Sequence, residues 1–177
     1  FDPLRVKRAW KERAASLLPS PLFEVDAHNI VPCWAASEKA EFGAYTLRPK
    51  ISRLLPRFLK DFPPLQPHPF PWKDAPSPID FGAALLRATP SGTVFEVKET
   101  VPGTKAGMSL LAEFLQDRLP SYAKDRNDPN RNGVSGLSPY LHFGQISPQR
   151  VALEASKAAV SEGSRKAFLE ELIVRRE

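Results

Sequence analysis

The sequence predicts the end of an α/β domain followed by an all-α region, with a proline-rich linker between them. Three observations support this order: a short β-prone run at residues 22–26, seven prolines at residues 62–79, and apolar residues at helical spacing in the C-terminal part. We therefore expect residues 1–61 to end the α/β domain, residues 62–100 to form the linker and residues 101–177 to begin a helical domain.

The first stretch predicts a surface helix and then a strand. Residues 4–18 place apolar side chains at helical spacing among lysines and arginines, and Pro19 ends this helix. Residues 22–26 are apolar and β-prone, and the polar residues 26–29 follow them directly. This pattern is typical of a strand in a parallel sheet that ends at a loop.

Two further helices are expected before the linker. Residues 37–47 have a helical composition, and Pro49 can begin another helix that runs to about Lys60. A bend is expected near Pro56, because a proline inside a helix removes a backbone hydrogen bond.

The linker and the region after it have a different character. The prolines of residues 62–79 exclude a regular helix or a central strand and favour extended backbone. A short helix at residues 80–88 and a strand at residues 94–97 are expected next. Because the linker separates the two regions, we expect two apolar clusters, one around residues 22–34 and one around residues 110–173.

The composition is that of a folded protein with a basic surface. Apolar residues make up 42% and aromatic residues 10% of the 177 positions, which excludes a fully disordered chain. The formal charge of +5 favours acidic partners, but such a balance also occurs in proteins that do not bind nucleic acid. Charge alone therefore leaves nucleic-acid binding open.

Cysteine usage and hydropathy predict an intracellular protein. The single cysteine, Cys33, cannot form an internal disulfide, which indicates a reducing compartment such as the nucleus or cytoplasm, with an organelle left open. No run of about 18 apolar residues exists and no signal-peptide layout begins the chain, so we expect no membrane association. The chain has no starting methionine and its last residues continue a helical pattern, so we expect an interior fragment of a longer protein.

Residues 122–129 and 135–148 carry most of the polar groups that could do chemistry. If residues 122–126 are helical, the ring of Tyr122 and the guanidinium of Arg126 lie on one face. Ser138 before Pro139 reads as an N-cap, and Ser147 before Pro148 repeats that pattern. With the hydroxyl of Ser135, such a helix start can bind phosphate, although both Ser-Pro pairs could also be plain caps.

Other site types are not expected. The three histidines are scattered and Cys33 has no ligand partner at metal spacing, so we predict no metal site. The chain has no glycine-rich nucleotide-binding fingerprint, and its three tryptophans lie among apolar or prolyl neighbours, which favours packing over electron transfer.

Three stretches resemble class II cyclobutane pyrimidine dimer DNA photolyases, a branch of the photolyase and cryptochrome superfamily. They are residues 24–34, the SGLSPYLHFGQIS run at residues 135–147 read together with residues 126–129, and residues 168–176 with FLEELIVRR. The resemblance implies a doubly wound parallel-sheet domain joined by a long linker to a helical domain that binds FAD. A second, antenna pigment in the α/β domain is compatible with it.

The resemblance also implies roles for particular residues. Tyr122, Ser135, Gly136, Leu137 and Ser138 are similar to part of the family's FAD site, with the loop facing phosphates. Arg126 and Glu171 resemble residues at the mouth of the flavin pocket, which a pyrimidine dimer enters after flipping out of UV-damaged DNA.

The chemistry implied is light-driven electron transfer from reduced FAD to the dimer, whose cyclobutane ring then splits. A carboxyl group hydrogen-bonded to a pyrimidine carbonyl would stabilise the reduced dimer, and an arginine fits a phosphate or a base edge. From the residues alone, Glu171 could equally pair with Arg175 four positions later, and Arg126 with a nearby acid. Glu170 projects about 100° from Glu171 on an α-helix and is expected to be silent.

The sequence departs from the family pattern in one visible place. Thr104 stands in the Pro102–Gly107 stretch where the family usually has an aromatic residue, so one packing contact is in doubt. The leading expectation is a fragment of a light-driven DNA-repair lyase, inactive in isolation and monomeric at full length. The alternatives are a fragment of a blue-light flavin photoreceptor, or a non-functional truncated product that binds nucleic acid weakly.

Overall fold

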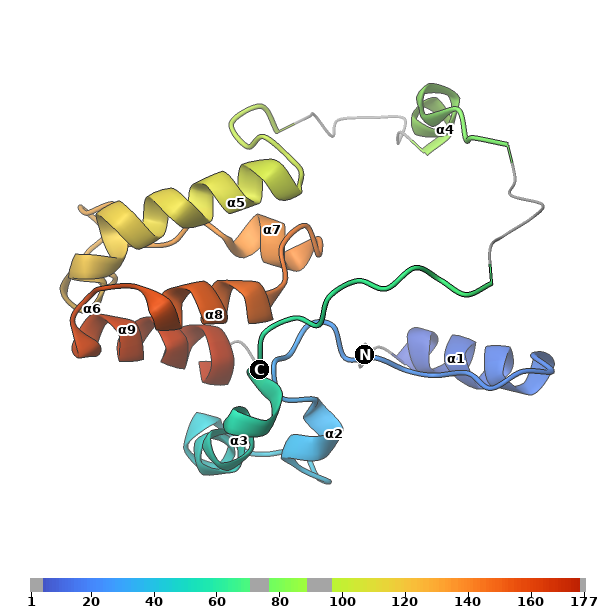
Figure 1. Ribbon diagram of the computed structural model, residues 1–177, viewed down its shortest axis with the longest axis horizontal. Coiled ribbons are helices and arrows are strands. Elements are labelled where there is room, and N and C mark those ends of the chain that lie inside the picture. The colour runs from blue at the N-terminus through green and yellow to red at the C-terminus, as the bar shows by residue number, and fades with distance from the viewer. Residues whose placement is uncertain (1–4, 71–76, 89–96, 176–177) are drawn as a thin grey trace. The chain divides into compact units, whose positions relative to one another are not determined.

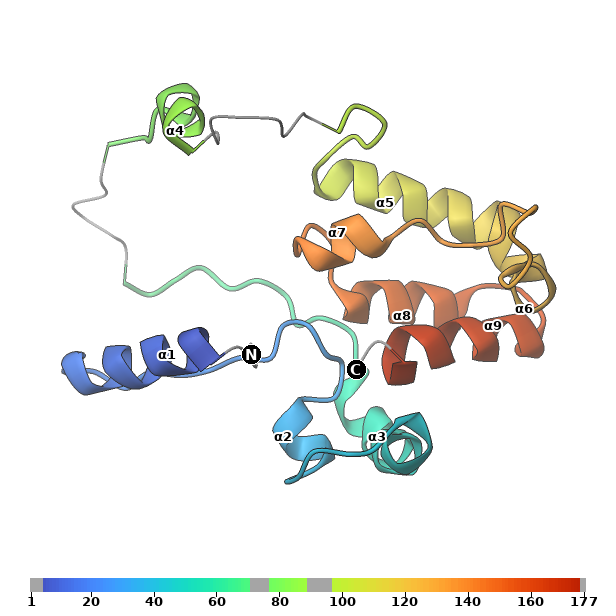
Figure 2. The same ribbon diagram turned by 180° about the vertical axis from the view of Figure 1, so that it is seen from behind.

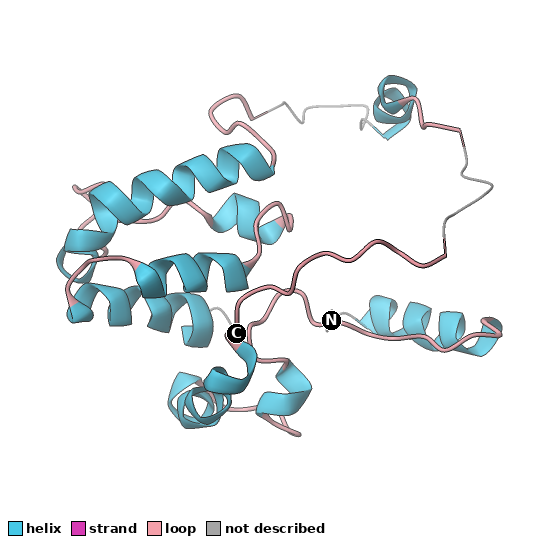
Figure 3. Cartoon of the chain, in the orientation of Figure 1, coloured by secondary structure: helices cyan, strands magenta, loops and turns pink. Residues whose placement is uncertain are grey.

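The computed structural model describes residues 5–70, 77–88 and 97–175, and every regular element in those ranges is helical (Figures 1 and 3). The chain divides into two compact units: residues 1–61 with residues 102–177, and residues 62–101. The helical part of the predicted fold class is therefore confirmed, whereas no part of an α/β sheet is present among the described residues.

The N-terminal stretch contains α1 (Arg5–Leu17), α2 (Cys33–Ala36) and α3 (Ala44–Phe58). Helix α1 agrees with the predicted helix and its proline stop. The strand predicted at residues 22–26 is wrong for this chain, since that segment is in no regular element and exposes Phe23 and Val25. A strand is stable only when its backbone groups pair with a neighbouring strand, and the described part of the chain offers none.

The turn that follows this segment is held by one carboxylate. Asp26 accepts hydrogen bonds from the backbone N–H groups of His28, Asn29 and Cys33 at 3.1 to 3.2 Å, and from the Asn29 side chain at 3.0 Å. Burial by itself would raise the pKa of Asp26, but these hydrogen bonds outweigh it and lower the pKa. The polar residues expected to end a strand therefore form a compact turn that leads into α2.

Helix α3 begins five residues earlier than predicted and contains both prolines. It starts at Ala44 after Gly43, and the hydroxyl of Thr46 donates to the Gly43 carbonyl at 2.9 Å. Pro49 and Pro56 each remove one helical hydrogen bond, a local cost that burial of the apolar face of α3 offsets. Ile51, on that face, is only 1% exposed.

Residues 62–101 form a unit of their own. Helix α4 (Phe81–Ala88) matches the short helix expected there. The prolyl stretch has no helix or strand at residues 62–70 or 77–80, as its proline density predicts. The strand expected at residues 94–97 falls outside the described residues except for Val97, which is in no regular element.

The C-terminal region is a set of short, closely connected helices. They are α5 (Thr104–Glu113), the π-helical η1 (Phe114–Arg118), the 3₁₀ turn η2 (Leu119–Ser121), α6 (Tyr122–Asp125), α7 (Ser138–His142), α8 (Pro148–Lys157), α9 (Glu162–Leu169) and the π-helical η3 (Glu170–Arg175). Helices α8 and α9 lie side by side in both views (Figures 1 and 2). Ser147 and Ser161 cap them by accepting backbone hydrogen bonds from Arg150 and Ser164.

One hydrophobic core spans both stretches of the larger unit, so the expectation of two separate clusters is wrong. Ile30, Val31 and Ile51 belong to the same buried cluster as Phe114 and Ile173. The reason is that α3 contacts η3, which closes the first stretch onto the helical region. Apolar area is buried most completely when the two stretches share an interior. This shared core fixes where the C-terminal helices present their polar side chains.

Candidate functional site

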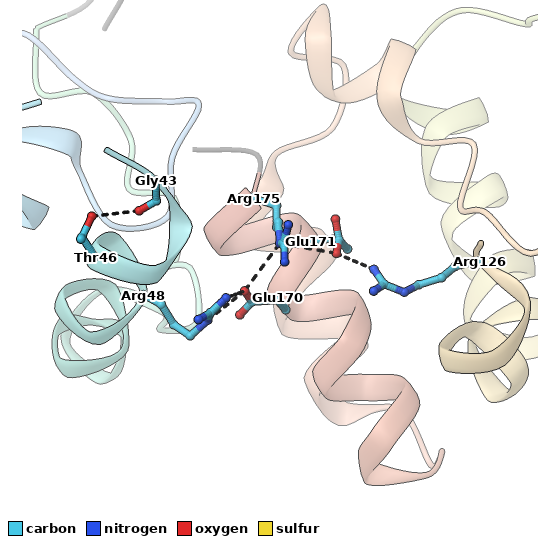
Figure 4. Close-up of polar contacts among 7 residues, drawn as sticks. All are labelled: Gly43, Thr46, Arg48, Arg126, Glu170, Glu171 and Arg175. Carbon is cyan, nitrogen blue, oxygen red and sulfur yellow. Dashed lines mark hydrogen bonds and ion pairs between the residues drawn. The ribbon is translucent and has the colours of Figure 1, made fainter. Parts of the chain in front are cut away.

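Arg126 and Glu171 come together although 45 positions separate them. Nη1 of Arg126 donates a hydrogen bond to Oε1 of Glu171, between the end of α6 and η3 (Figure 4). The backbone N–H of Arg126 bonds to the Tyr122 carbonyl at 3.1 Å, which continues the turn of α6. The side chains of Arg126 and Glu171 are 27% and 34% exposed, so a ligand can reach the pair from solvent.

Tyr122 supports this pair from the core side. Its ring is 7% exposed and packs edge-to-face on the rings of Phe114 and Phe168, with centroids 5.8 and 5.3 Å away. The guanidinium carbon of Arg126 lies 6.0 Å from the Tyr122 ring centroid, within cation–π range. The aromatic trio therefore fixes the position from which Arg126 reaches toward η3.

The charges of these groups are set by one another. The hydrogen bond to Glu171 raises the pKa of Arg126, against a lowering by burial, so the guanidinium stays charged. Burial raises the pKa of Tyr122; the positive charge of Arg126 opposes that rise and the negative charge of Glu171 adds to it. At neutral pH the Arg126 guanidinium is therefore charged and the Tyr122 phenol keeps its proton.

Glu170, which was expected to have little effect on repair, has a partner of its own. Its Oε1 accepts from Nε and Nη2 of Arg48 at 2.9 and 2.6 Å (Figure 4). The expected pairing of Glu171 with Arg175 is present only as a long contact of 3.9 Å, and Glu170 lies at the same distance from Arg175. A matched control must therefore come from another carboxylate.

The loop that carries the predicted phosphate contacts has a defined shape. Ser135 Oγ accepts from the Leu137 N–H at 3.3 Å, and Gly136 has φ +71°, a conformation that favours glycine. The sequence predicts Ser138 as the N-cap of α7, but the N-cap residue is Leu137. The Leu137 carbonyl accepts the first helical hydrogen bond, from the Leu141 N–H, at 3.0 Å. The helix begins one residue earlier because Leu137 already has helical backbone angles.

Two contacts hold the start of this loop. Nη1 of Arg118 donates to the Val134 carbonyl at 3.1 Å. Gly133 lies so close to α6 that a Cβ there would stand 2.6 Å from the backbone carbonyl atoms of Asp125. The loop is therefore tied to the helix that carries Tyr122.

The exposed groups of the loop suit phosphate oxygens. Gly136 and Ser138 are exposed and Ser135 is half-buried, so a ligand can reach this part of the loop from solvent. Leu137 is fully buried, and its backbone N–H and carbonyl already bond to Ser135 and Leu141, so it supports the loop from the core. Likewise Tyr122 is almost fully buried and supports the site from inside.

Three residues that shape the candidate site were not predicted from the sequence. Arg48 lies 122 positions from Glu170, and nothing in the local pattern predicts that pair. Arg118 and Gly133 shape the loop through contacts that form only after folding. A glycine just before the Ser-Gly-x-Ser run was the one local signal, because glycines mark close backbone approaches.

The described ranges contain neither a membrane-spanning helix nor a metal cluster. No described helix is long and apolar enough to cross a membrane. No group of three or more His, Cys, Asp or Glu side chains is arranged to hold a metal ion within residues 5–70, 77–88 and 97–175.

Comparisons with known proteins point to one enzyme name. The chain is 43% identical over 180 residues to a deoxyribodipyrimidine photo-lyase of Potorous tridactylus and 45% identical over 188 residues to one of Arabidopsis thaliana. Each match covers all of this chain but 34% and 38% of the relative, so the chain spans about a third of their length. A cryptochrome-1 of Sinapis alba is 46% identical over 50 residues, 28% of this chain and 10% of that protein. No protein-family model matches the chain.

Proposed function

Because the chain is homologous over its whole length to part of deoxyribodipyrimidine photo-lyases, we propose that it is part of an enzyme that splits pyrimidine dimers in UV-damaged DNA with light. We further propose that the enzyme belongs to the class II branch, uses FAD and acts by electron transfer. The match over the whole of this chain supports the assignment to the photo-lyases. A photoreceptor role has less support, since the cryptochrome match reaches only 28% of the chain.

The Arg126–Glu171 pair is proposed to receive the flipped dimer. The imide edge of a pyrimidine presents an N–H donor between two carbonyl acceptors, and this pair offers a donor and an acceptor side by side. An ion-paired carboxylate has no proton to give, so Glu171 accepts from the pyrimidine N–H. Arg126 then donates to a carbonyl. This differs from the sequence-based expectation, which assigned the carbonyl contact to Glu171.

Arg126 thereby becomes the group that stabilises the reduced dimer. Negative charge develops on the pyrimidine carbonyls when an electron arrives, and a fixed cation beside them is worth more in that state than in the neutral one. Glu171 holds Arg126 in place and orients the base. FAD, when bound, supplies the light-absorbing electron donor.

The loop before α7 is proposed to contact the flavin's phosphates. Ser135, Gly136 and Ser138 contribute hydroxyl and backbone groups, and buried Leu137 holds the loop against the core. Tyr122 is proposed to meet the cofactor at its polar end. The chain spans about a third of the length of its photo-lyase relatives, and we propose that it is inactive by itself.

The assignment is tested in the full-length protein. Purified protein should hold flavin and restore dimer-containing DNA under blue light. Arg126→Ala should weaken the affinity for dimer DNA and reduce its dependence on salt, because a lost cation releases fewer counterions on binding. Protein that binds flavin but neither binds nor repairs dimer DNA would favour the photoreceptor alternative.

A further inference from the structure

Two consecutive carboxylates begin η3, and arginines from two distant parts of the chain hold them. Glu170 accepts from Nε and Nη2 of Arg48, and Glu171 accepts from Nη1 of Arg126. Arg175 Nε lies 3.9 Å from one oxygen of each carboxylate. Figure 4 shows the result: a row in which cationic and anionic groups alternate, from α3 across η3 to α6.

Arg48 comes from a firmly packed helix. Ile51, three residues later and thus on the same side of α3, is buried in the core that includes Leu172 and Ile173 of η3. Helices α3 and η3 are in contact, and the Glu170 side chain is 28% exposed. The Arg48–Glu170 pair therefore lies at the edge of an apolar contact that keeps its two ends in place.

We propose that Arg48 is a positioning residue for Glu171, acting through Glu170. Successive side chains leave a helical backbone at a fixed angle, so holding Glu170 against α3 fixes the rotation of η3 and hence the direction of Glu171. Such positioning matters more here because η3 is π-helical. The π-helix is rare overall, and where it occurs it is frequently at functional sites. Tertiary contacts hold the segment in this form.

The expected effect of Arg48 on repair rests on the proposed role of the Arg126–Glu171 pair. The coupling between Arg48 and Arg126 can be measured independently of that role. Arg48 and Arg126 contact different carboxylates. If both arginines fix the same rotation of η3, removing one changes how much the other contributes to stability. Two separate surface ion pairs would instead act independently, each with a small effect.

The experiment uses the full-length protein with Arg48→Ala, Glu171→Gln and their double variant. Lys157→Ala is the matched control, because Lys157 pairs with Asp61 at 3.0 Å and joins the same two stretches of chain without a carboxylate of η3. Flavin occupancy, affinity for dimer DNA and repair yield per absorbed photon are measured for each.

We expect Arg48→Ala to lower the yield at unchanged flavin occupancy by no more than Glu171→Gln does, about 1.4- to 5-fold, because a positioning residue can cost at most what the group it positions contributes. In the Glu171→Gln background Arg48→Ala should have a smaller effect than in the unmodified protein, because only the amide oxygen remains to be positioned. Arg48→Lys should recover part of the yield, and Lys157→Ala should leave it intact. Provided that Glu171→Gln itself lowers the yield, an unchanged yield in Arg48→Ala, an additive loss in the double variant, or an equal loss in Lys157→Ala would overturn the inference.

Thermal unfolding separates this inference from the proposed function. The midpoint shift of Arg48→Ala combined with Arg126→Ala should be smaller than the sum of the two single shifts. If Glu171→Gln retains full repair, the proposed role of Glu171 is wrong, while non-additive midpoints would still support positioning by Arg48. Additive midpoints would contradict it whatever the repair assay shows.

Discussion

The ion pair at the candidate site predicts that Arg126 matters more for ring splitting than Glu171. Arg126→Gln removes the cation that would face the reduced dimer, and a hydrogen bond to a charged group contributes about 1.5–3 kcal/mol. The Arg126 side chain is 27% exposed, which places the loss near the lower limit, about tenfold in the rate of ring splitting. Glu171→Gln keeps an acceptor oxygen and removes only a partly exposed ion pair, about 0.2–1 kcal/mol or a factor of about 1.4 to 5.

The assay is repair yield per absorbed photon at saturating dimer DNA, with flavin occupancy measured on the same samples. Glu162→Gln is the matched control, because Glu162 makes an exposed pair with Lys166 at 2.6 Å on α9. Its yield should equal that of the unmodified protein. A larger loss in Glu171→Gln than in Arg126→Gln, at equal flavin occupancy, would show that Glu171 is the charge-stabilising group and that the assignment drawn from the ion pair is wrong.

Three further predictions concern the loop, the pH response and the isolated chain. Gly133→Ala places a Cβ 2.6 Å from backbone atoms of Asp125 and should destabilise the fold by about 1–3 kcal/mol in urea unfolding; Gly163→Ala meets no neighbour within 4 Å and should not destabilise. Hydrogen bonds from Lys50 and Ser37 lower the pKa of Glu41 from 4.5 to about 2. The folding stability that ionised Glu41 contributes above about pH 4.5 should therefore be lost as pH falls toward 2, and a pH dependence of unfolding unchanged by Lys50→Met would contradict this. This chain alone should bind FAD poorly, fail to repair dimers and aggregate, since it exposes large apolar side chains such as Phe23; stoichiometric flavin with blue-light repair would refute this.

Local patterns predicted the elements whose signals are complete within a few residues. The helix that ends before Pro19, the helix at residues 81–88 and the serine cap at Ser147 all formed as expected. Each depends on apolar spacing or a capping hydroxyl, which act over one or two turns. The helical turn that places Tyr122 below Arg126 was predictable for the same reason.

Elements that need a distant partner were not predictable in this way. Residues 22–26 have the composition of a strand but stay irregular, because a strand requires a neighbour to pair its backbone. Helix α3 continues through Pro49 because burial of Ile51 outweighs a local cost. Sequence spacing shows the local cost of a proline but not the burial that offsets it.

The sequence by itself determined the family resemblance, the helical character of the C-terminal region and the identity of the candidate residues Arg126 and Glu171. The tertiary structure decided the ion-pair partners. Glu171 lies closer to Arg126 than to Arg175, and Glu170 pairs with Arg48. The physical reason is that a helical pattern specifies only contacts three or four residues apart. Partners 45 and 122 positions away meet when one shared core brings α3, α6 and η3 together.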